Sequence, residues 1–480
     1  PGFLNGWADL RTFGDMAVAA GAGVGGGSLI YANISVEAKP EVFARGWPPD
    51  IDYETLAPYY RRVGAMLDVQ ELPDNQLTER YKLMQEGAEK CGWGERFRKL
   101  PLAVSFDPEF SYAREDACSE HHSKTHVNRQ GREQGTCVHC GNCDIGCQVK
   151  AKNTLDLNYL AIAEDRGAEI RPLHRVVMLE PFGSGYRVHY DRIDPDTHCL
   201  QRGTLTAQRV LLGAGSIGTT ELLLRCRDEY KTLPDLSPRL GHGWAFNGDF
   251  VTPTFYAKRR VAPTRGPTIT CAIDLLDYAA DGQALFIEDG GVPDLAAEFV
   301  KRRIRRAGRM SWLDWLGKRG ERRLWRELGK VIDSADPLGN MMPWFGQGVD
   351  AADGRLYLGR LWYAPWRRTL RMDWDYRRSE AVVEAMVATH CKLSAATGGE
   401  PCVPATWTYL RNLVTPHPLG GCNMGVTAAN GVVDSFGRVF GHANLFVMDG
   451  AMVPRAIGLN PSRTIAALAE RNCEALCRSA

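Results

Sequence analysis

The stretch His417-Pro418-Leu419-Gly420-Gly421-Cys422 sets an imidazole in a stiff turn that is followed by two glycines. Pro416 and Pro418 flank the histidine. A proline restricts its own backbone and that of the residue before it, so His417 is kept out of a helix. The glycines lack a Cβ, which lets the backbone come close to a ligand. We therefore expect a histidine presented from a rigid loop toward a bound molecule, with a purely structural histidine as the alternative.

A second stretch, Gly458-Leu459-Asn460-Pro461-Ser462-Arg463-Thr464-Ile465, marks the start of a helix. Asparagine is a favoured N-cap and proline suits the first helical turn, so we expect the helix to begin at Asn460 and Pro461. Unpaired N–H groups and the positive end of the helix dipole gather at such a start, which favours a ligand that becomes negatively charged. Two interpretations of Asn460 stay open: a polar group that faces this ligand, or a plain helix cap.

Together with Val447-Met448-Asp449-Gly450, these stretches resemble the C-terminal signature of the glucose–methanol–choline (GMC) flavoprotein oxidoreductases, and most of all their cholesterol-oxidase branch. The resemblance implies a mixed α/β fold: a GMC-type FAD-binding domain, truncated here, and a substrate domain with an antiparallel sheet. It also implies that His417 accepts or steers the proton of a substrate hydroxyl and that Asn460 holds the substrate oxygen. The FAD would take a hydride from the carbinol carbon.

Two glycine-rich segments, residues 21–28 and 213–218, match the Gly-x-Gly-x-x-Gly spacing of dinucleotide-binding loops. Such a match counts only between a strand and a helix with an acidic residue about 20 positions later, and neither segment meets both conditions. The resemblance instead places the first segment against the flavin and the phosphate fingerprint before residue 1, so we expect the first βαβ unit to be missing. The implied FAD contacts are Gly26, Gly27, Ser28, Asn33, Val176, Asp449, Gly450, Asn460, Pro461 and Ser462.

The resemblance also suggests a discontinuous domain organisation. We expect residues 1–35, 153–250 and 411–480 to form the FAD-binding domain, and residues 36–152 and 251–410 to form the substrate-binding domain. Val176 lies in the first of these domains, where its backbone would hold the adenine.

The local sequence pattern predicts a helix over residues 53–67 and a second helix that Thr154 caps and Gly167 ends. A further helix is expected from Thr219 to Arg225. Short strands are expected at residues 169–171, 175–180, 185–190 and 208–212.

Glu288 is the third candidate for the reaction site. Phe286-Ile287-Glu288 resembles the Phe-x-Glu of cholesterol oxidases, whose glutamate faces the steroid. A carboxyl group in an apolar pocket has the raised pKa that proton transfer needs. The alternative is a glutamate at a strand edge or on the surface, which is the common location of this residue type.

The four cysteines Cys137, Cys140, Cys143 and Cys147 lie within eleven residues, with the C-x-x-C-x-x-C-x-x-x-C spacing of bacterial iron–sulfur sites. Gln148 follows the last cysteine where ferredoxins carry proline, and no second run completes a two-cluster pattern. Zinc is an alternative, with nearby side chains as further ligands, and free or structural thiols are another. The nearby candidates are Cys118, His121, His122, His126 and His139.

The overall composition bounds the remaining function classes. Among 480 residues, 58 Lys and Arg balance 57 Asp and Glu, so nothing indicates nucleic-acid binding. The long uncharged runs are rich in glycine and proline, so we expect no transmembrane helix. Fourteen cysteines favour a thiol-keeping, cytoplasmic compartment over a disulfide framework. Residues 301–330 mix basic and aromatic side chains, which suits either peripheral contact with an anionic membrane or a solvated helix over the core.

The expected function is FAD-dependent oxidation of an alcohol, with a sterol or another hydrophobic alcohol as the substrate class. The electron acceptor stays open between oxygen and an electron-transfer partner. A different class of function also stays open: an iron–sulfur or metal-binding electron-transfer module, built on the four cysteines, without alcohol chemistry.

Overall fold

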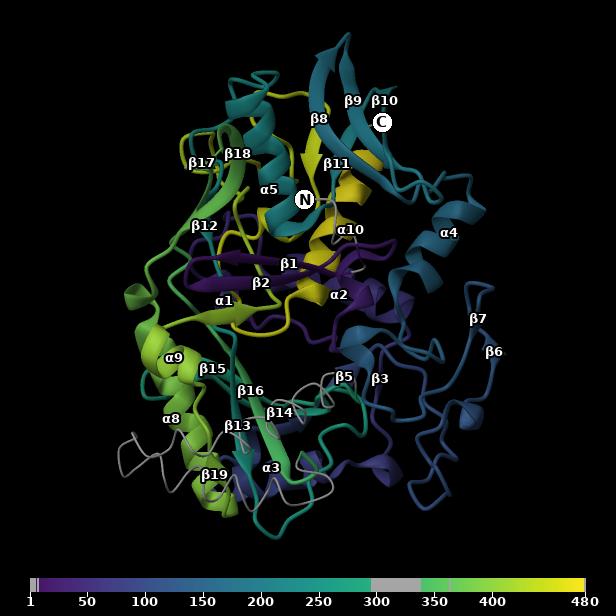
Figure 1. Ribbon diagram of the computed structural model, residues 1–480, viewed down its shortest axis with the longest axis vertical. Helices are drawn as coiled ribbons and strands as arrows, with labels where there is room; N and C mark the ends of the chain where they lie inside the picture. The colour runs from purple at the N-terminus through teal and green to yellow at the C-terminus, as the bar shows by residue number, and fades with distance from the viewer. Residues whose placement is uncertain (1–5, 7, 295–337, 362–363, 479–480) are drawn as a thin grey trace.

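The computed structural model describes residues 6, 8–294, 338–361 and 364–478. Figure 1 shows two regions stacked along the long axis, with α10 (Ser462–Arg478) and α2 (Tyr53–Met66) beside each other near the middle. The Tyr60 hydroxyl and Thr464 Oγ1 hydrogen bond at 2.9 Å in this buried contact. Buried apolar side chains of both regions pack as one continuous cluster, so the regions share a core.

The lower region is built on an antiparallel sheet. Its strand order is β19 (Glu400–Pro401), β13 (Phe250–Phe255), β16 (Met341–Gly348), β15 (Gln283–Asp289), β14 (Cys271–Ala280) and β4 (Phe97–Lys99). Helices α3 (Glu79–Lys90) and α8 (Glu380–Thr397) pack together against it. Because β15 is covered on both sides, its apolar residues run continuously instead of alternating.

Successive side chains of β15 still point to opposite faces of the sheet. Asp289 faces α3, where it meets the buried Arg80 guanidinium at 3.3 Å. Glu288 therefore points to the other face. The sheet thus separates a helix-packed side from the side that carries the candidate site.

The upper region carries the nucleotide-domain elements. Strands β11 (Val210–Leu212) and β21 (Leu445–Val447) pair in parallel, and α5 (Gly215–Leu224) follows β11. Asp449, just after β21, accepts hydrogen bonds from the Gly215 N–H at 2.8 Å and from Thr219 Oγ1 at 2.5 Å. These bonds fix the start of α5 to the end of the parallel pair.

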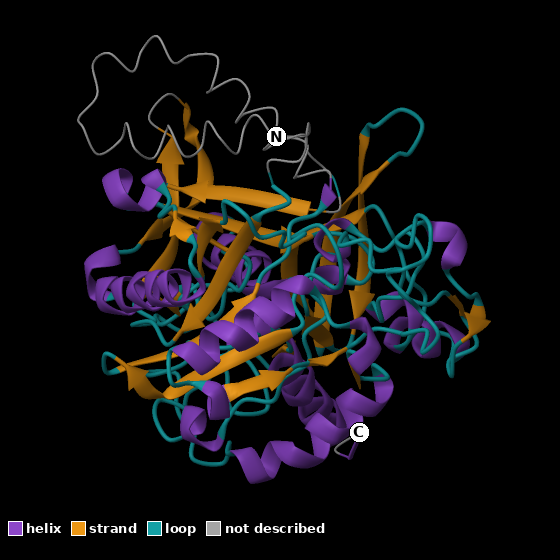
Figure 2. Ribbon diagram, turned by 90° about the horizontal axis from the view of Figure 1, so that it is seen from below, coloured by secondary structure: helices purple, strands orange, loops and turns teal. Residues whose placement is uncertain are grey.

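Three smaller sheets complete this region and the middle of the molecule. They are β8 (His174–Phe182), β9 (Gly185–Ile193) and β10 (Leu200–Ala207); β1 (Ala8–Phe13), β2 (Met16–Gly21) and β20 (Leu413–Thr415); and β12 (His242–Trp244), β17 (Gly354–Leu361) and β18 (Ala364–Asp373). Figure 2 shows the helices lying along the flanks of the sheets.

The remaining elements are short. The helices are α1 (Pro40–Phe43), α4 (Tyr159–Asp165), α9 (Ala405–Leu410) and a π-helical turn at Arg225–Glu229. The strand pairs are β3 (Gln70–Glu71) with β5 (Pro101–Leu102), and β6 (His126–Val127) with β7 (Glu133–Gln134). The 3-10 turns are Gly26–Leu29, Asp74–Gln76, Gly94–Arg96, Glu120–His122, Cys143–Ile145, Leu155–Leu157, Tyr376–Arg378 and Gly450–Met452.

Several predicted elements are confirmed and others are wrong. Helices α2 and α5 lie where the sequence predicts them, and so do β8, β9 and β11. Thr154 stands at the N-cap position of the 3-10 turn Leu155–Leu157 without a side-chain capping bond, and α4 is capped instead by Asn158 Oδ1, which accepts the Tyr159 N–H at 2.7 Å. Residues 169–171 form no strand, whereas the largely polar β10 was not predicted.

The amphipathic stretch at residues 301–330, which the sequence connects with a membrane surface, lies outside the described residues. Within the described ranges, no helix has both the length and the apolar character that crossing a bilayer requires.

Candidate active site

His417 lies in the loop after β20 and is held by a carboxylate. Its Nδ1 lies 2.8 Å from Asp249 Oδ1, and its side chain is 20% exposed. Asp249 directly precedes β13, and its Oδ2 accepts from Thr415 Oγ1 at 2.5 Å. Because Nδ1 faces a carboxylate, it carries the ring proton, and Nε2 is left as an acceptor for a ligand. The sequence offers no signal for Asp249 as this partner.

Asn460 lies at the start of α10 but does not cap it. The helix begins at Ser462, one residue later than predicted, with the Ile465 N–H donating to Pro461 O at 2.9 Å. Asn460 Nδ2 instead lies 3.4 Å from Glu288 Oε2. This contact favours the first of the two interpretations of Asn460, a polar group that faces the site.

Glu288 is fully buried in a central strand, not at an edge. Its Oε2 also accepts a hydrogen bond from Gln347 Nε2 of β16 at 3.0 Å. Burial raises the pKa of Glu288 well above its ordinary value, and the charges of Asp289 and Asp249 act in the same direction against the hydrogen bonds from Asn460 and Gln347. A protonated Glu288 has a hydroxyl hydrogen to donate.

Three oxygen atoms of this group have no hydrogen-bond partner among the described residues: Asn460 Oδ1, Glu288 Oε1 and Gln347 Oε1. An unpaired buried polar atom costs free energy, so such atoms call for a ligand or water. These three oxygen atoms lie in the same small group: the two amide oxygens can accept a hydrogen bond, and the hydroxyl of a protonated Glu288 can donate one. The arrangement therefore suits a molecule with a polar group that can pair these buried atoms.

The His417 and Asn460 groups belong to one site. Phe345 pairs with Glu288 in the register of β16 and β15, so both side chains share one face of the sheet. The Phe345 ring also lies against the His417 imidazole, with centroids 6.2 Å apart. The Asp249 charge acts on Glu288 as well. Two segments far apart in the chain thus bring an imidazole and a carboxamide to the same face.

The segment expected to lie against the flavin forms an open backbone cradle. A Cβ at Gly26 or Gly27 would meet nothing within 4 Å, so the space beside these residues is free. Asn33 is fully buried in a left-handed conformation (φ 65°), and neither atom of its amide has a partner among the described residues. Free space beside the backbone, with unpaired buried donors and acceptors, fits a polar planar ring such as that of FAD.

The other predicted FAD contacts are placed as follows. Ser28 Oγ donates to Gly25 O at 2.7 Å, and Ser462 Oγ donates to Ile34 O at 3.2 Å. Gly450 O accepts the Gly420 N–H at 2.9 Å. Val176 is 42% exposed on β8. The Asp449 carboxylate is already used at the start of α5, which leaves the backbone as the part of this residue open to a ligand.

The four-cysteine run lies close to this cradle. Lys152 Nζ donates to Cys143 O at 2.6 Å and to Leu29 O at 2.9 Å, and so connects the run to the segment after Gly27. Backbone N–H groups donate to the sulfur atoms of Cys137 (from His139, 3.4 Å) and Cys147 (from Ala151, 3.1 Å).

These thiols do not form a site for a single ion. Burial raises the pKa of Cys137 well above its ordinary value and that of Cys140 to about 12. In the part of the chain that the structure describes, no three His, Cys, Asp or Glu side chains converge so that they could hold a metal ion. The predicted metal site at Cys137, Cys140, Cys143 and Cys147 is therefore not supported as a mononuclear zinc site.

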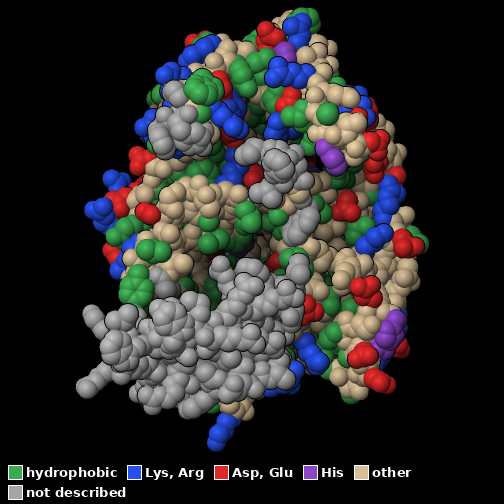
Figure 3. Space-filling view, in the orientation of Figure 1, with side chains coloured by type: hydrophobic (Ala, Val, Ile, Leu, Met, Phe, Trp, Pro, Cys, Tyr) green, Lys and Arg blue, Asp and Glu red, His purple; other side chains and the backbone are tan. Residues whose placement is uncertain are grey.

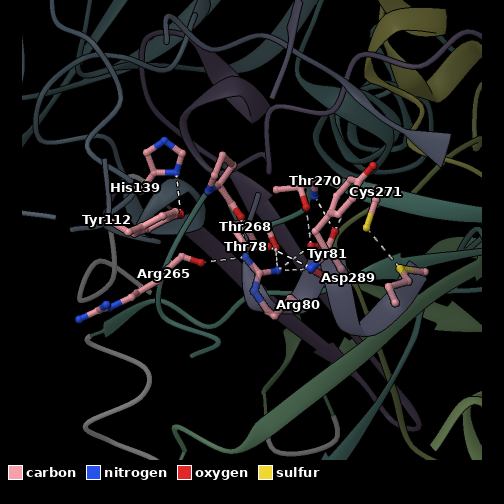
Figure 4. A network of polar contacts seen from close by, with 12 residues as sticks. Thr78, Arg80, Tyr81, Tyr112, His139, Arg265, Thr268, Thr270, Cys271 and Asp289 are labelled. Carbon is pink, nitrogen blue, oxygen red and sulfur yellow. Dashed lines mark hydrogen bonds and ion pairs between the residues drawn. The ribbon is translucent and has the colours of Figure 1, made fainter. Parts of the chain in front are cut away.

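His139 is not available as a further metal ligand. Its ring nitrogens are both engaged, Nδ1 with the Tyr112 hydroxyl at 2.9 Å and Nε2 with Gln76 Oε1 at 2.8 Å. Burial lowers the pKa of His139 to about 3, so the ring is neutral. Figure 4 shows this histidine beside the buried network of Arg80, whose guanidinium donates to Pro267 O at 2.7 Å.

Comparisons with known proteins show which proteins this chain resembles. A family model described as GMC oxidoreductase matches residues 333–469. A cholesterol oxidase from Acinetobacter baumannii is 28% identical over 98% of this chain and 83% of its own length. A cholesterol oxidase from Mycobacterium tuberculosis is 29% identical over 95% of this chain and 78% of its own length. Pyridoxine 4-oxidase from Mesorbium loti has a similar fold, with a TM-score of 0.59 at 15% identity over 99% of this chain and 89% of that chain.

The fold and these comparisons define the class of protein, an FAD-dependent oxidoreductase that acts on alcohols. Residues 333–469 match the GMC oxidoreductase family, and over most of its length the chain is similar to the cholesterol oxidases. The family and the mixed fold with an antiparallel sheet, both predicted from sequence resemblance, are confirmed.

Proposed function

We propose that this chain oxidises a hydrophobic alcohol, with His417, Asn460 and Glu288 at the reacting atoms. The observation that carries the proposal is the meeting of two groups on one face of the β15–β16 sheet. One group is an imidazole fixed by Asp249 with Nε2 left for a ligand. The other is the buried Asn460 and Glu288, which present unpaired oxygen atoms.

When bound, FAD supplies the acceptor for the hydride that leaves the carbinol carbon. His417 Nε2 takes the hydroxyl proton in the same oxidation, which leaves a carbonyl product. Asp249, at 2.8 Å, holds the ring in the tautomer that makes Nε2 the base and stabilises the imidazolium that results. The proton and the hydride are thereby both accounted for.

Asn460 and Glu288 would hold and orient the alcohol. Asn460 Nδ2 can donate to the substrate oxygen, since its contact with Glu288 is long at 3.4 Å. A protonated Glu288 can donate a second hydrogen bond without bringing a negative charge close to the developing carbonyl. The N-terminus of α10 adds a positive dipole end next to Asn460, which favours negative charge on the reduced cofactor.

The substrate class follows from the site walls and the relatives. Phe345 borders His417, while Val349 and Leu276 lie against Gly458, so the approach to Asn460 is largely apolar. The names of the two cholesterol oxidases support a sterol or another bulky hydrophobic alcohol and favour oxygen as the electron acceptor. We also keep the proposed division into an FAD domain (1–35, 153–250, 411–480) and a substrate domain (36–152, 251–410).

Anaerobic reduction of the bound flavin by sterols and long-chain alcohols tests this function. His417→Ala or Asn460→Ala is expected to slow the reduction at least about a hundredfold, as removal of general acid–base or oxyanion-stabilising groups does. His189 and Asn128 provide matched controls. His189 is also paired with a carboxylate, Glu180, at 3.3 Å, and Asn128 is a carboxamide away from the site whose hydrogen bonds go to backbone groups. Wild-type reduction rates in both site variants would refute the proposal.

A specific observation also favours a cluster at the cysteine run. Backbone N–H groups donate to Cys137 and Cys147, as they do to cluster sulfurs, and Lys152 links the run to the flavin-facing segment. As the alternative to oxygen as acceptor, we propose that Cys137, Cys140, Cys143 and Cys147 would hold an iron–sulfur cluster, which would supply a route for electrons to a partner protein. The family assignment gives no support to an electron-transfer module without alcohol chemistry.

Iron analysis and visible spectra of protein purified without oxygen test the cluster. Cys140→Ser should abolish the iron content, whereas Cys199→Ser, at an exposed thiol outside the run, should leave it unchanged. Protein that contains FAD but no iron would show that the four thiols are structural.

A further inference from the structure

The loop Phe246–Asp249, which enters β13, contacts both parts of the candidate active site. Asp249 binds His417 Nδ1 at 2.8 Å. Thr415 Oγ1 accepts the His417 N–H at 2.9 Å, and its one hydrogen is shared between Asp249 Oδ2 at 2.5 Å and the Phe246 carbonyl at 3.0 Å. Both the ring and the backbone of His417 are therefore fixed to this loop.

Asn247, in the same loop, binds the segment that leads into Asn460. Its Oδ1 accepts the N–H groups of Ile457 at 3.0 Å and Gly458 at 2.9 Å, and its Nδ2 donates to Leu459 O at 2.9 Å. Asn247 is completely buried, and these bonds cover the three residues directly before Asn460. The position of the Asn460 backbone depends on them.

The loop itself is held by hydrogen bonds to Asp350 and to Gly348 at the end of β16. Asp350 Oδ2 accepts the Phe246 N–H at 2.8 Å. The Gly348 N–H, at the end of β16, donates to the Asn247 carbonyl at 3.1 Å. Gly248 has φ 68°, and a Cβ there would lie 2.4 Å from Gly348 N, so only glycine lets the loop press this closely against β16.

We propose that Asn247 and Asp249 are the positioning residues of the site, and that this loop sets the distance between the imidazole of His417 and the carboxamide of Asn460. The proposal rests on the proposed function. The loop holds both side chains in place before the substrate binds. Less conformational entropy is therefore lost when the substrate oxygen is bound between them. Neither Asn247 nor Asp249 needs to touch the substrate for this role.

Asn128 is a matched control for Asn247, because its Oδ1 also accepts two backbone N–H groups (Gln130, 3.0 Å; Arg132, 2.9 Å) and its Nδ2 donates to a backbone carbonyl (Leu157, 2.9 Å). Asn247→Ala and Asn128→Ala thus remove the same set of bonds. Flavin reduction is followed per bound FAD, so that loss of folded protein does not count. We expect the limiting rate to fall at least about tenfold in Asn247→Ala only, with a change in half-saturating substrate below about threefold.

Hydrogen exchange of the cofactor-free protein gives a readout that does not depend on turnover. Asn247→Ala should expose the amides of Ile457 and Gly458 to faster exchange, whereas Asn128→Ala should not. If Asn247→Ala does not fold, Asn247→Asp keeps the acceptor and loses the donor to Leu459. Wild-type rates and wild-type exchange in the folded variants would overturn the proposal for Asn247.

Asp249→Asn and Asp249→Glu test the other half of the loop. The downfield proton resonance of an Nδ1–H bonded to a carboxylate should disappear in Asp249→Asn, as in His417→Ala, and return in Asp249→Glu together with part of the rate. An unchanged resonance in Asp249→Asn would refute the pairing. If Asn460→Ala and His417→Ala are slow while Asn247→Ala and Asp249→Asn are not, the loop inference fails and the proposed function stands.

Discussion

The two groups that meet at the site differ in how completely their polar atoms are paired. The His417 group is one-fifth exposed, and each oxygen of Asp249 has a partner. The Asn460 group is buried, and three of its oxygen atoms have no partner among the described residues. Both carboxylate oxygens of the first group are therefore paired, whereas the second group keeps three oxygen atoms that a bound molecule could pair.

This difference bears on which role each group takes in the proposed reaction. The His417 side chain is 20% exposed, and its Nδ1 lies 2.8 Å from the Asp249 carboxylate. Near Asn460 a full negative charge is disfavoured, because burial raises the pKa of Glu288 well above its ordinary value. The proposed function therefore assigns proton transfer to the first group and neutral hydrogen bonding to the substrate oxygen to the second.

The largest expected effect concerns whether the two groups act on the same hydroxyl. Each single variant, His417→Ala or Asn460→Ala, is expected to cost at least about a hundredfold in flavin reduction. If both act in one transition state, the double variant should be about as slow as the slower single variant, since groups that work as a unit are not additive. Rapid-mixing measurements of all three variants check this. A double variant slower by the product of the single effects would separate the two groups.

A smaller effect is expected for Phe345, which lies between the groups. Its ring packs against His417 and shares a sheet face with Glu288, so Phe345→Ala opens the dry side of the site to water. We expect a fall in kcat/KM of about tenfold for a hydrophobic alcohol, within the range for losing a buried ring contact. Phe97→Ala is the control, because Phe97 is a half-buried ring on an edge strand of the same sheet that packs on Tyr81. Equal losses in both variants would show that only stability has changed.

The sequence predicts His417 and Asn460 as site residues, but it does not predict Asp249, the residue that holds His417. His417 and Asn460 stand next to proline and glycine, which restrict or free the backbone in recognisable ways. Their roles stay predictions, but both residues lie where those patterns indicate. Asp249 had no such signal, because 168 positions separate it from His417 and only the folded chain brings them together.

Strand register explains why the contact between Glu288 and Gln347 could not be predicted from the sequence. Glu288 and Gln347 are 59 positions apart and become neighbours because β15 and β16 pair with Phe286 opposite Gln347. A shift of the register by one residue would turn Gln347 to the helix-packed face. A local pattern cannot supply such a register. The same limit applies to Asn158, which caps α4 in place of Thr154 because the chain first makes a 3-10 turn.

The smallest expected effect tests the neutral state of Glu288 through stability. Burial raises its pKa in the folded protein above the value of about 4.3 in the unfolded chain. As the pH rises above about 4.3, the unfolded chain releases this proton while the folded protein keeps it, so wild-type stability falls until the pH reaches the folded pKa. Glu288→Gln does not titrate and escapes this loss. Its Tm relative to wild type should therefore increase by a few degrees between pH 5 and pH 8 in thermal unfolding scans. A Tm difference that stays constant over this range would mean that Glu288 is ionised in the folded protein. The Asn460 group would then carry a charge, and it would no longer differ in this respect from the His417 group.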